Sequence, residues 1–587
     1  MSTEFTTEHV IKAVNTLNMG NVVWADEYLA AFQKSNDTWI IADEILSHRP
    51  PHDLHIMTFA AMSLAKKIKE CFHNLGKSQL ISLKHCLIEH LKDAAMMPDS
   101  NSLIVQLGVC LSALGLMVSQ WDHELQDFVQ KLSGKPQYVM ALLEVLKVVP
   151  EETRPSNLLL PAEQLHIVIN QLQFESQYIL DVLEGLLERQ DLPDDALSKC
   201  LAVCASWTKF GLLSPVEVLD SKLLLKVETI LVTPLLKGHL QAAELIVAML
   251  EQSLVRTDLD GRLADLVISL KPAFKRSMGE SPLLQNYCNI FVNLFNTHFK
   301  LTQTSPERLE ERLLTIELLL LIAEESPVEV MEASLGMWSS ISEEVLHDAD
   351  PYKYSVYRPY FLRLLDLLFP RAALPASYEF TMPPGSADRQ RFRGLIGEVL
   401  LDMAHMINAD TMERLYNIVV DEQSPWTTVE AGVFFLRHLM GSMKKQQTDI
   451  ILSILNHIHD RPQAFIRLQL LELISIPQTV SIEIIWACLV NELRRAEPML
   501  PAIECRLNLL MPHWNYLVIL AIEVDEFRLE ESERCQLLSS ICALIRELPA
   551  THILRAKRSM LNVKWLRCPV HTQANRLKLL QNSFELI

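Results

Sequence analysis

Residues 53–75 read DLHIMTFAAMSLAKKIKECFHNL, and this stretch decides the fold class. Its apolar side chains recur at helical spacing, and one helical face collects Met57, Ala61, Leu64, Ile68, Phe72 and Leu75. The other side of the same helix carries Met62, Lys66, Lys69 and His73. An apolar stripe this wide must be buried against a neighbour. The stretch therefore predicts a long helix that packs against other helices.

Nearly every other segment shows the same helical period, and alternation typical of strands is almost absent. Two helix pairs stand out: residues 309–323 with 328–345, and residues 412–420 with 426–440. In both pairs a Ser-Pro step precedes the second helix, as it does at Ser214-Pro215, because Ser can cap free N–H groups and Pro fits the first helical position. Pairs recurring about every 40 to 47 residues are typical of HEAT and armadillo arrays. We predict an all-α protein, a HEAT/armadillo-type α-solenoid made of a superhelical array of antiparallel helix pairs.

One segment interrupts the helical pattern. Residues 371–391 contain Pro375, Pro383, Pro384 and Gly385 without a helical period, so we predict a long inter-helix loop there. A surface insertion is the favoured interpretation, with a hinge as the alternative. The predicted divisions are residues 1–150, 151–370, the loop 371–391, and residues 392–587.

Composition narrows the classes of partner. The 587 residues carry 53 Lys and Arg against 72 Asp and Glu, for a net charge of −19. We therefore expect no direct nucleic-acid binding, because a phosphate backbone needs the opposite charge. The eleven Cys form no C-x-x-C pair, and the N-terminus has no secretory pattern, so a soluble protein of a reducing compartment is predicted. No apolar run reaches the length that a bilayer needs, so no membrane contact is expected.

The sequence lacks the motifs that mark common nucleotide-binding and catalytic sites. There is no phosphate-binding loop, dinucleotide-binding glycine pattern or G-x-S-x-G elbow. The nearest approach to a zinc-protease helix is HELQD, residues 123–127, where Asp127 replaces the second His. His457 with His459, and His52 with His55, lack a third ligand, so solvated or capping roles are favoured. We predict that the protein is not an enzyme, has no catalytic or metal-binding residues, and needs no cofactor.

Charge is unevenly distributed. From residue 552 to the end, seven basic residues face one acid, and subtracting this +6 from −19 leaves −25 on residues 1–551. The candidate anion- or cargo-binding residues in this tail are Arg555, Lys557, Arg558, Lys564 and Arg567. The favoured alternative is a final amphipathic pair with solvated cations. The acidic remainder either keeps a large array soluble or lines a concave face that holds basic cargo.

At the N-terminus the sequence resembles a known family. The matching residues are ADEYLAAFQKS (25–35), Thr38-Trp39, Ile45-Leu46, Phe59-Ala60-Ala61, Leu64 and Lys67-Ile68. This pattern is similar to the importin-beta N-terminal domain. Further matches, to the branch of transportin-SR (transportin-3) and importin-13, are LLEVLKVVPEE (142–152), Ser206-Trp207, Gly211, TIELLL (315–320), Trp338, Leu415-Tyr416, SPW (424–426) and Glu430-Ala431. The resemblance covers about residues 5–440.

The resemblance implies a nuclear import receptor that shuttles between nucleus and cytoplasm. It implies that residues 1–150 bind the small GTPase Ran in its GTP form, with Met62, Lys66 and Lys69 as candidate contacts. Ran and import cargo would compete for one flexible superhelix, which is negative coupling between two ligands. Cargo of this branch includes Arg/Ser-rich splicing factors. Phe-Gly nucleoporins would bind apolar pockets between outer helices, to which the sequence assigns no residue.

Two departures from the branch leave alternatives open. Members are longer, and no copy of their arginine-rich cargo helix is found here, which fits a fragment, a short isoform or a divergent receptor. The loop at 371–391 has two acids, Glu379 and Asp388, where relatives look acidic. The alternative function is a HEAT-repeat scaffold, such as a phosphatase regulatory subunit, that ignores Ran.

Overall fold

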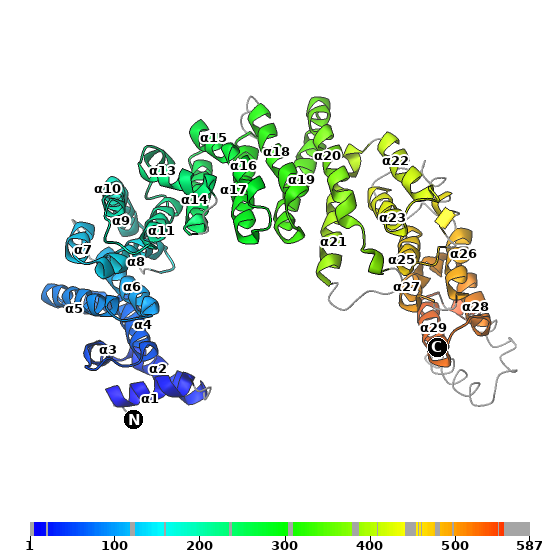
Figure 1. Ribbon diagram of the computed structural model, residues 1–587. Helices are drawn as coiled ribbons and strands as arrows, with labels where there is room; N and C mark the ends of the chain where they lie inside the picture. The colour runs from blue at the N-terminus through cyan, green and yellow to red at the C-terminus, as the bar shows by residue number, and fades with distance from the viewer. Residues whose placement is uncertain are drawn as a thin grey trace. The chain divides into compact units, whose positions relative to one another are not determined.

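The computed structural model describes residues 5–18, 22–117, 124–157, 160–233, 237–302, 309–378, 387–407, 409–440, 453–455, 457–458, 461–475, 482–495, 498–549, 551–553 and 555–556. Every regular element in these ranges is an α-helix or a short 3₁₀ turn, and the helices follow one another as packed pairs (Figure 1). The prediction of an all-α solenoid is therefore confirmed. No described helix is both long and apolar enough to cross a membrane.

The chain divides into two compact units, Met1–Val330 and Met331–Ile587. The first unit contains two rows of helices. We call one the B row, in which each helix packs on the next: α4 (Leu54–Cys71), α6 (Asn101–Met117), α8 (Pro136–Glu152), α11 (Ala196–Lys209), α14 (His239–Val255) and α17 (Ser281–Thr302). The predicted functional divisions at residues 150 and 370 stay predictions.

The second row, the A row, packs along the B row, with α9 packing on its neighbour α10 (Figure 1). Its helices are α3 (Thr38–Ser47), α5 (Lys77–Ala95), α7 (Glu124–Leu132), α9 (Ala162–Phe174), α10 (Ser176–Leu187), α13 (Leu223–Val232), α15 (Gly261–Ser269) and α16 (Lys271–Arg276). The unit also contains α1 (Thr7–Asn18), α2 (Val22–Lys34), α12 (Pro215–Leu219) and α18 (Leu309–Glu325). The core lies between packed helices, where Phe32 of α2, Trp207 of α11 and Phe274 of α16 are fully buried.

Helix α4 follows the predicted pattern closely. Met57, Ala61, Leu64 and Ile68 are buried, whereas Met62 is 47% exposed. The α-helix ends at Cys71, and one 3₁₀ turn, η1 (Phe72–Asn74), completes the predicted stretch. The sequence pattern therefore placed both the helix and its buried face.

The Ser-Pro steps lie at helix starts, as predicted, but only one of them forms the expected cap. Ser214 accepts a hydrogen bond from Glu217 N at 3.2 Å, and Glu217 accepts one from Ser214 N at 2.7 Å, which is a capping box. Helices α19 (Val328–Asp348) and α23 (Trp426–Met440) also start directly after Ser-Pro. However, Ser326 is buried without such a bond, and Ser424 donates to Asp421 instead. At those two sites the Pro directly precedes the first helical residue and the Ser does not form the predicted cap.

The second unit continues the helix pairs. Its elements are α20 (Pro351–Ala372), η3 (Ala376–Tyr378), α21 (Ala387–Asp402), η4 (Met403–Met406), α22 (Ala409–Val420), α23, α25 (Ala464–Leu473), α26 (Ile482–Leu493), α27 (Leu500–Glu504), η6 (Leu507–His513), α28 (Trp514–Ile522), η7 (Val524–Glu526) and α29 (Glu531–Arg546). Helix α23 is central to the unit, since α20, α21, α22 and α25 all pack on it.

The predicted loop at residues 371–391 is shorter than expected. Helix α20 extends to Ala372, and α21 already begins at Ala387. Arg389, which falls within the predicted loop, belongs to α21 and donates to Ala373 O at 2.8 Å, and Arg393 of the same helix donates to Ala372 O at 2.5 Å. These bonds satisfy carbonyls that a helix end leaves open. Residues 379–386, with the predicted Pro and Gly positions 383–385, lie outside the described residues.

Candidate functional site: a groove across the B row

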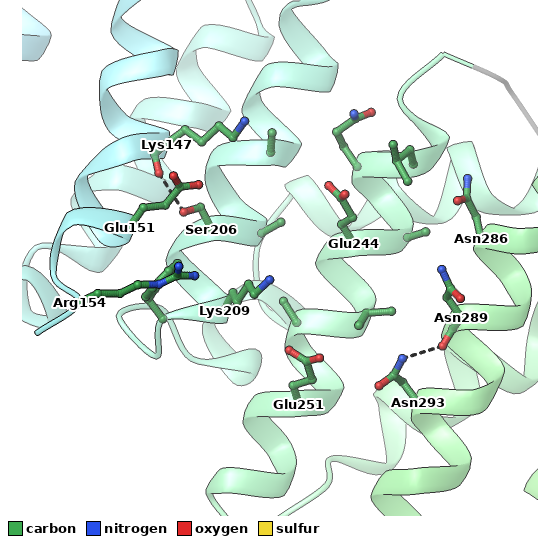
Figure 2. Close-up of a pocket in the computed structure, with 18 residues that line it drawn as sticks. Lys147, Glu151, Arg154, Ser206, Lys209, Glu244, Glu251, Asn286, Asn289 and Asn293 are labelled. Atoms are coloured by element: carbon green, nitrogen blue, oxygen red, sulfur yellow. Dashed lines mark hydrogen bonds between the residues drawn. The ribbon is translucent and has the colours of Figure 1, made fainter. Parts of the chain in front are cut away.

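A groove with a volume of about 480 Å³ crosses four neighbouring helices of the B row, namely α8, α11, α14 and α17 (Figure 2). We call it the B-row groove. Its floor consists largely of small residues, among them Ala202, Ala205, Ala243 and Ala248. Its polar lining comprises Lys147, Glu151, Arg154, Ser206, Lys209, Gln241, Glu244, Glu251, Asn286, Asn289 and Asn293. Because the floor residues are small, the longer polar side chains around them are accessible from the groove.

The α8 side of the groove is held by two hydrogen bonds from α11. Pro150 lies in the last turn of α8 and has no N–H, so the carbonyl of Leu146 lacks its usual helical donor. The buried indole of Trp207 replaces that donor, with Nε1 donating to Leu146 O at 2.9 Å. Ser206 Oγ donates to the neighbouring Lys147 O, also at 2.9 Å. The Ser206-Trp207 pair thus fixes α11 against α8 and sets where Lys147 stands.

The C-terminal end of α11 is held by a glycine turn and by a hydrogen bond from α14. The helix ends at Lys209, and Gly211 has a φ of +71°, which favours glycine and turns the chain away. From α14, Gln252 Nε2 donates to Lys209 O at 3.0 Å. The backbone of Lys209 is therefore anchored while its side chain is exposed at the groove.

Cations line the α8 and α11 side of the groove together with one acid, Glu151, and two further acids line the α14 side (Figure 2). Lys147, Arg154 and Lys209 come from the α8 and α11 side, and Glu244 and Glu251 come from α14. Within the described part of the chain none of these five forms an ion pair, although the Arg154 guanidinium lies 5.0 Å from the centre of the Phe210 ring. Both signs of charge are therefore available to a ligand.

Helix α17 adds a stripe of amides. Asn286, Asn289 and Asn293 lie at i, i+3 and i+7, so they share one helical face. The buried Asn286 donates from Nδ2 to His239 Nδ1 at 3.0 Å. Asn293 donates to Asn289 O at 2.9 Å, and Asn289 Oδ1 accepts from Gln285 at 3.2 Å. Among the described residues this leaves the Asn289 amide N–H groups and the Asn293 Oδ1 without a partner.

His239 is neutral in this arrangement. It is fully buried at the start of α14, and burial lowers its pKa to about 4. The unprotonated Nδ1 can therefore accept the hydrogen bond from Asn286, whose position in the groove depends on that bond.

A smaller hollow of about 260 Å³ adjoins the groove and shares Lys147, Ala202 and Gln241 with it. Two of its charges pair with each other, Lys199 with Glu144 at 2.6 Å. Ser198 donates to Gln241 at 2.8 Å, which links α11 to α14. These two contacts therefore hold α8, α11 and α14 together beside the smaller hollow.

The predicted GTPase contacts all lie on α4, but their surroundings differ. Met62 is exposed. Lys66 donates to Gln33 Oε1 of α2 at 3.2 Å. Lys69 reaches past α6 and pairs with Glu152 of α8 at 2.5 Å. Burial raises the pKa of Glu152, and the ammonium of Lys69 opposes that rise. Lys69 is thus part of the packing between B-row helices, and Met62 remains the most accessible of the three.

The candidate tail residues are mostly beyond the structural description. Arg555 is exposed, whereas Lys557, Arg558, Lys564 and Arg567 lie outside the described residues. The same holds for His123 and His459. His457 bonds Ser453 O, and His55 bonds Asn15, as expected for capping or solvated histidines. No group of metal-binding side chains is found in the described ranges. Burial raises the pKa of Cys200 to about 12, so this thiol is unreactive.

The B-row groove was not predicted from the sequence. Its members are spread from residue 147 to residue 293, and only packing brings them together. One signal was available, namely three Asn at i, i+3 and i+7 on a long helix, because amides on one face are unusual where the rest of the helix is apolar.

Two family models match stretches of the chain on either side of α14. The family model described as "Exportin 1-like protein" matches residues 100–237, and the one described as "Transportin-3/Importin-13 second TPR domain" matches residues 280–370. The first match contains α8 and α11 of the groove, and the second contains α17.

Curated relatives and a solved structure extend the likeness. Importin-13 of Bos taurus is 24% identical over 489 residues, which cover 78% of this chain and 49% of that protein. Transportin MOS14 of Arabidopsis thaliana is 20% identical over 472 residues, covering 75% and 48%. The structure "Importin13 cytosolic state" has a TM-score of 0.63 at 15% identity, covers 90% of this chain and 66% of its own, and shares the fold. The chain spans about half the length of the curated relatives it matches.

Proposed function

This chain belongs to the importin-beta family, in the branch of importin-13 and transportin-3, and from that membership we propose that it is a nuclear transport receptor. It carries protein cargo through the nuclear pore and responds to Ran in its GTP form. The observation that carries the proposal is the B row itself, a continuous run of packed helices from α4 to α17. Such a row offers one extended surface to macromolecular partners.

The proposed Ran surface lies at the start of the B row. Met62 is exposed on α4, and Lys66 is only half-buried beside it. Lys67 next to them is buried and donates to Lys34 O at 3.0 Å, so it stabilises α4 against α2. We assign the direct contact with Ran to Met62 and Lys66. Lys69 instead holds α4 in place relative to α8.

One packing contact would connect the proposed Ran surface to the groove. Lys69 of α4 pairs with Glu152, which directly follows the groove residue Glu151 on α8. A ligand that shifts α4 would therefore act on the α8 side of the groove through this partly buried ion pair. This coupling is how Ran binding would lower cargo affinity, and cargo binding would lower Ran affinity by the same factor.

A pull-down tests the surface assignment. Immobilised Ran carrying a non-hydrolysable GTP analogue should retain the full chain, and Met62→Glu should weaken retention by introducing an unpaired charge. Ile81→Glu is the matched control, because Ile81 is 71% exposed on α5 of the A row. If Met62→Glu and Ile81→Glu were retained equally well, α4 would not be part of the Ran surface. If neither Ran-GTP nor Ran-GDP retained the unchanged chain, the scaffold function would be favoured.

Contacts with the pore are proposed on the A row. Ile81 of α5, Ile167 of α9 and Leu225 of α13 are 71%, 55% and 64% exposed. Exposed aliphatic side chains of this kind suit weak binding of Phe side chains from Phe-Gly nucleoporins. A triple change of these residues to Ser should reduce retention on an immobilised Phe-Gly repeat and leave Ran binding intact.

Cargo is proposed to be protein, and Arg/Ser-rich splicing factors are one candidate class. Shuttling between cytoplasm and nucleus follows from the same proposal. Localisation of the fluorescently tagged chain before and after depletion of Ran-GTP would test it, and a distribution that never includes the nucleus would contradict it.

A further inference from the structure

The B-row groove has features that point to a particular kind of ligand. It combines cations on the α8 and α11 side, acids on α14 with one more, Glu151, on α8, and amides on α17 that keep open hydrogen-bonding positions. We propose that the groove binds an extended polypeptide segment that carries one acidic and one basic side chain three residues apart. This inference rests on the proposed transport function for its biological meaning, since the segment would be a recognition element of protein cargo.

The spacing follows from helix packing. Neighbouring packed helices lie about 8–10 Å apart. A chain in polyproline-II conformation rises about 3.1 Å per residue and has three residues per turn, so every third side chain points the same way about 9.3 Å further on. A segment that crosses α11 and then α14 therefore places side chains i and i+3 over successive helices. A β-strand would point side chains i and i+3 to opposite faces.

The charges define which side chains fit. The acidic side chain of the segment lies over the exposed Lys209 of α11, with Lys147 of α8 beyond it. The basic side chain lies over α14, between Glu244 and Glu251. A wholly acidic segment would meet Glu244 and Glu251 with like charge, and a wholly basic one would meet Lys209. Like charges are unfavourable in both cases, so the groove selects a segment with both signs.

The amides define the conformation. A polyproline-II segment has no internal hydrogen bonds, so its carbonyls and N–H groups seek partners from the protein. Asn289 offers amide N–H groups and Asn293 offers Oδ1, and both lie on the α17 side of the groove (Figure 2). An amide both donates and accepts, so it binds a peptide backbone of any sequence. Sequence selection is thus left to the two charged positions.

Labelled peptides test the spacing directly. The probes are fluorescein-labelled eleven-residue peptides of Pro and Ser that contain one Asp and one Arg, at i and i+3, i and i+2, or i and i+1. Their composition and net charge are identical. Fluorescence anisotropy with the full chain at low ionic strength should give the lowest Kd for the i and i+3 peptide, by roughly two- to five-fold for each ion pair gained. Equal Kd values for the three spacings would overturn the inference.

Charge-reversal variants test the location. Lys209→Glu should weaken binding of the Asp/Arg peptide and strengthen binding of a peptide with Arg at both i and i+3. Glu251→Lys should weaken the same Asp/Arg peptide and favour Asp at both positions. Lys226→Glu is the matched control, since Lys226 is exposed on α13 of the A row and makes the same change in net charge. If Lys226→Glu has the same effect as Lys209→Glu, the peptide binds by net charge alone and the groove assignment is wrong.

The outcome is separable from the proposed function. If the i and i+3 peptide is selected but Ran is not bound in a GTP-dependent manner, the groove inference stands and the transport proposal fails. If Ran-GTP is bound but the three spacings are equivalent, the transport proposal stands and the groove inference fails.

Discussion

Replacing Arg393 by methionine should destabilise the second unit by removing one partner of a buried ion pair. Arg393 of α21 is 7% exposed, and Glu430 of α23 is fully buried. Arg393 donates from Nη2 to Glu430 Oε1 at 2.6 Å and from Nη1 to Oε2 at 2.9 Å. It also donates to Ala372 O at the end of α20. One guanidinium therefore joins three helices.

The expected loss is about 3–5 kcal/mol, the cost of leaving a buried charge without its partner. After the change Glu430 keeps one neutral donor, Gln469 Nε2 at 3.1 Å. Burial raises the pKa of Glu430 from its ordinary 4.5, and the guanidinium of Arg393 opposes that rise. Without the guanidinium the pKa rises further, so the folded variant holds a proton that the unfolded chain releases above pH 4.5. Its stability then falls as pH increases, and the gap to the unchanged protein is wider at pH 8 than at pH 5.

Hydrogen exchange of α21 and α23 peptides, followed by mass spectrometry at pH 5 and pH 8, reports the opening free energy of these helices. The double variant Arg393→Met with Glu430→Gln is the control, because it removes both charges and should recover much of the loss. A loss below about 1 kcal/mol at pH 8, or the same loss at both pH values, would refute the reasoning.

Three further changes have defined outcomes in thermal or urea unfolding. Trp207→Phe should cost about 1–3 kcal/mol, because Leu146 O loses its only substitute for the helical donor that Pro150 lacks; a neutral result would contradict this role. The first unit should lose stability as pH falls from about 6.5 to about 4, since the unfolded chain protonates His239 and the folded one does not; His239→Gln should flatten that slope. Gly432→Ala should destabilise α23, because its Cβ would lie 2.7 Å from Val419 Cγ2; a more stable variant would show that the helices readily move apart.

The local features of the fold could be predicted from the sequence. The helical period of residues 53–75 identified α4 and its buried face, and Ser-Pro steps marked the starts of α12, α19 and α23. These are properties of adjacent residues, which a sequence displays directly. The resemblance to the importin-beta N-terminal domain likewise rests on short local stretches.

Contacts between distant residues could not be predicted in this way. Lys69 looked like an outward side chain because its partner, Glu152, is two B-row helices away. Arg389 looked like a loop residue because its acceptor, Ala373 O directly after α20, precedes the Pro-rich segment. The B-row groove depends on four helices stacking in register, which no single stretch encodes.

The most direct test of the account is the affinity of the full chain for Ran in its two nucleotide states, measured by isothermal titration calorimetry under one set of conditions. A nuclear transport receptor of this family should bind Ran with the GTP analogue more tightly than Ran with GDP by well over tenfold, a difference above about 1.4 kcal/mol. Equal affinities, or no binding of either form, would contradict the proposed function.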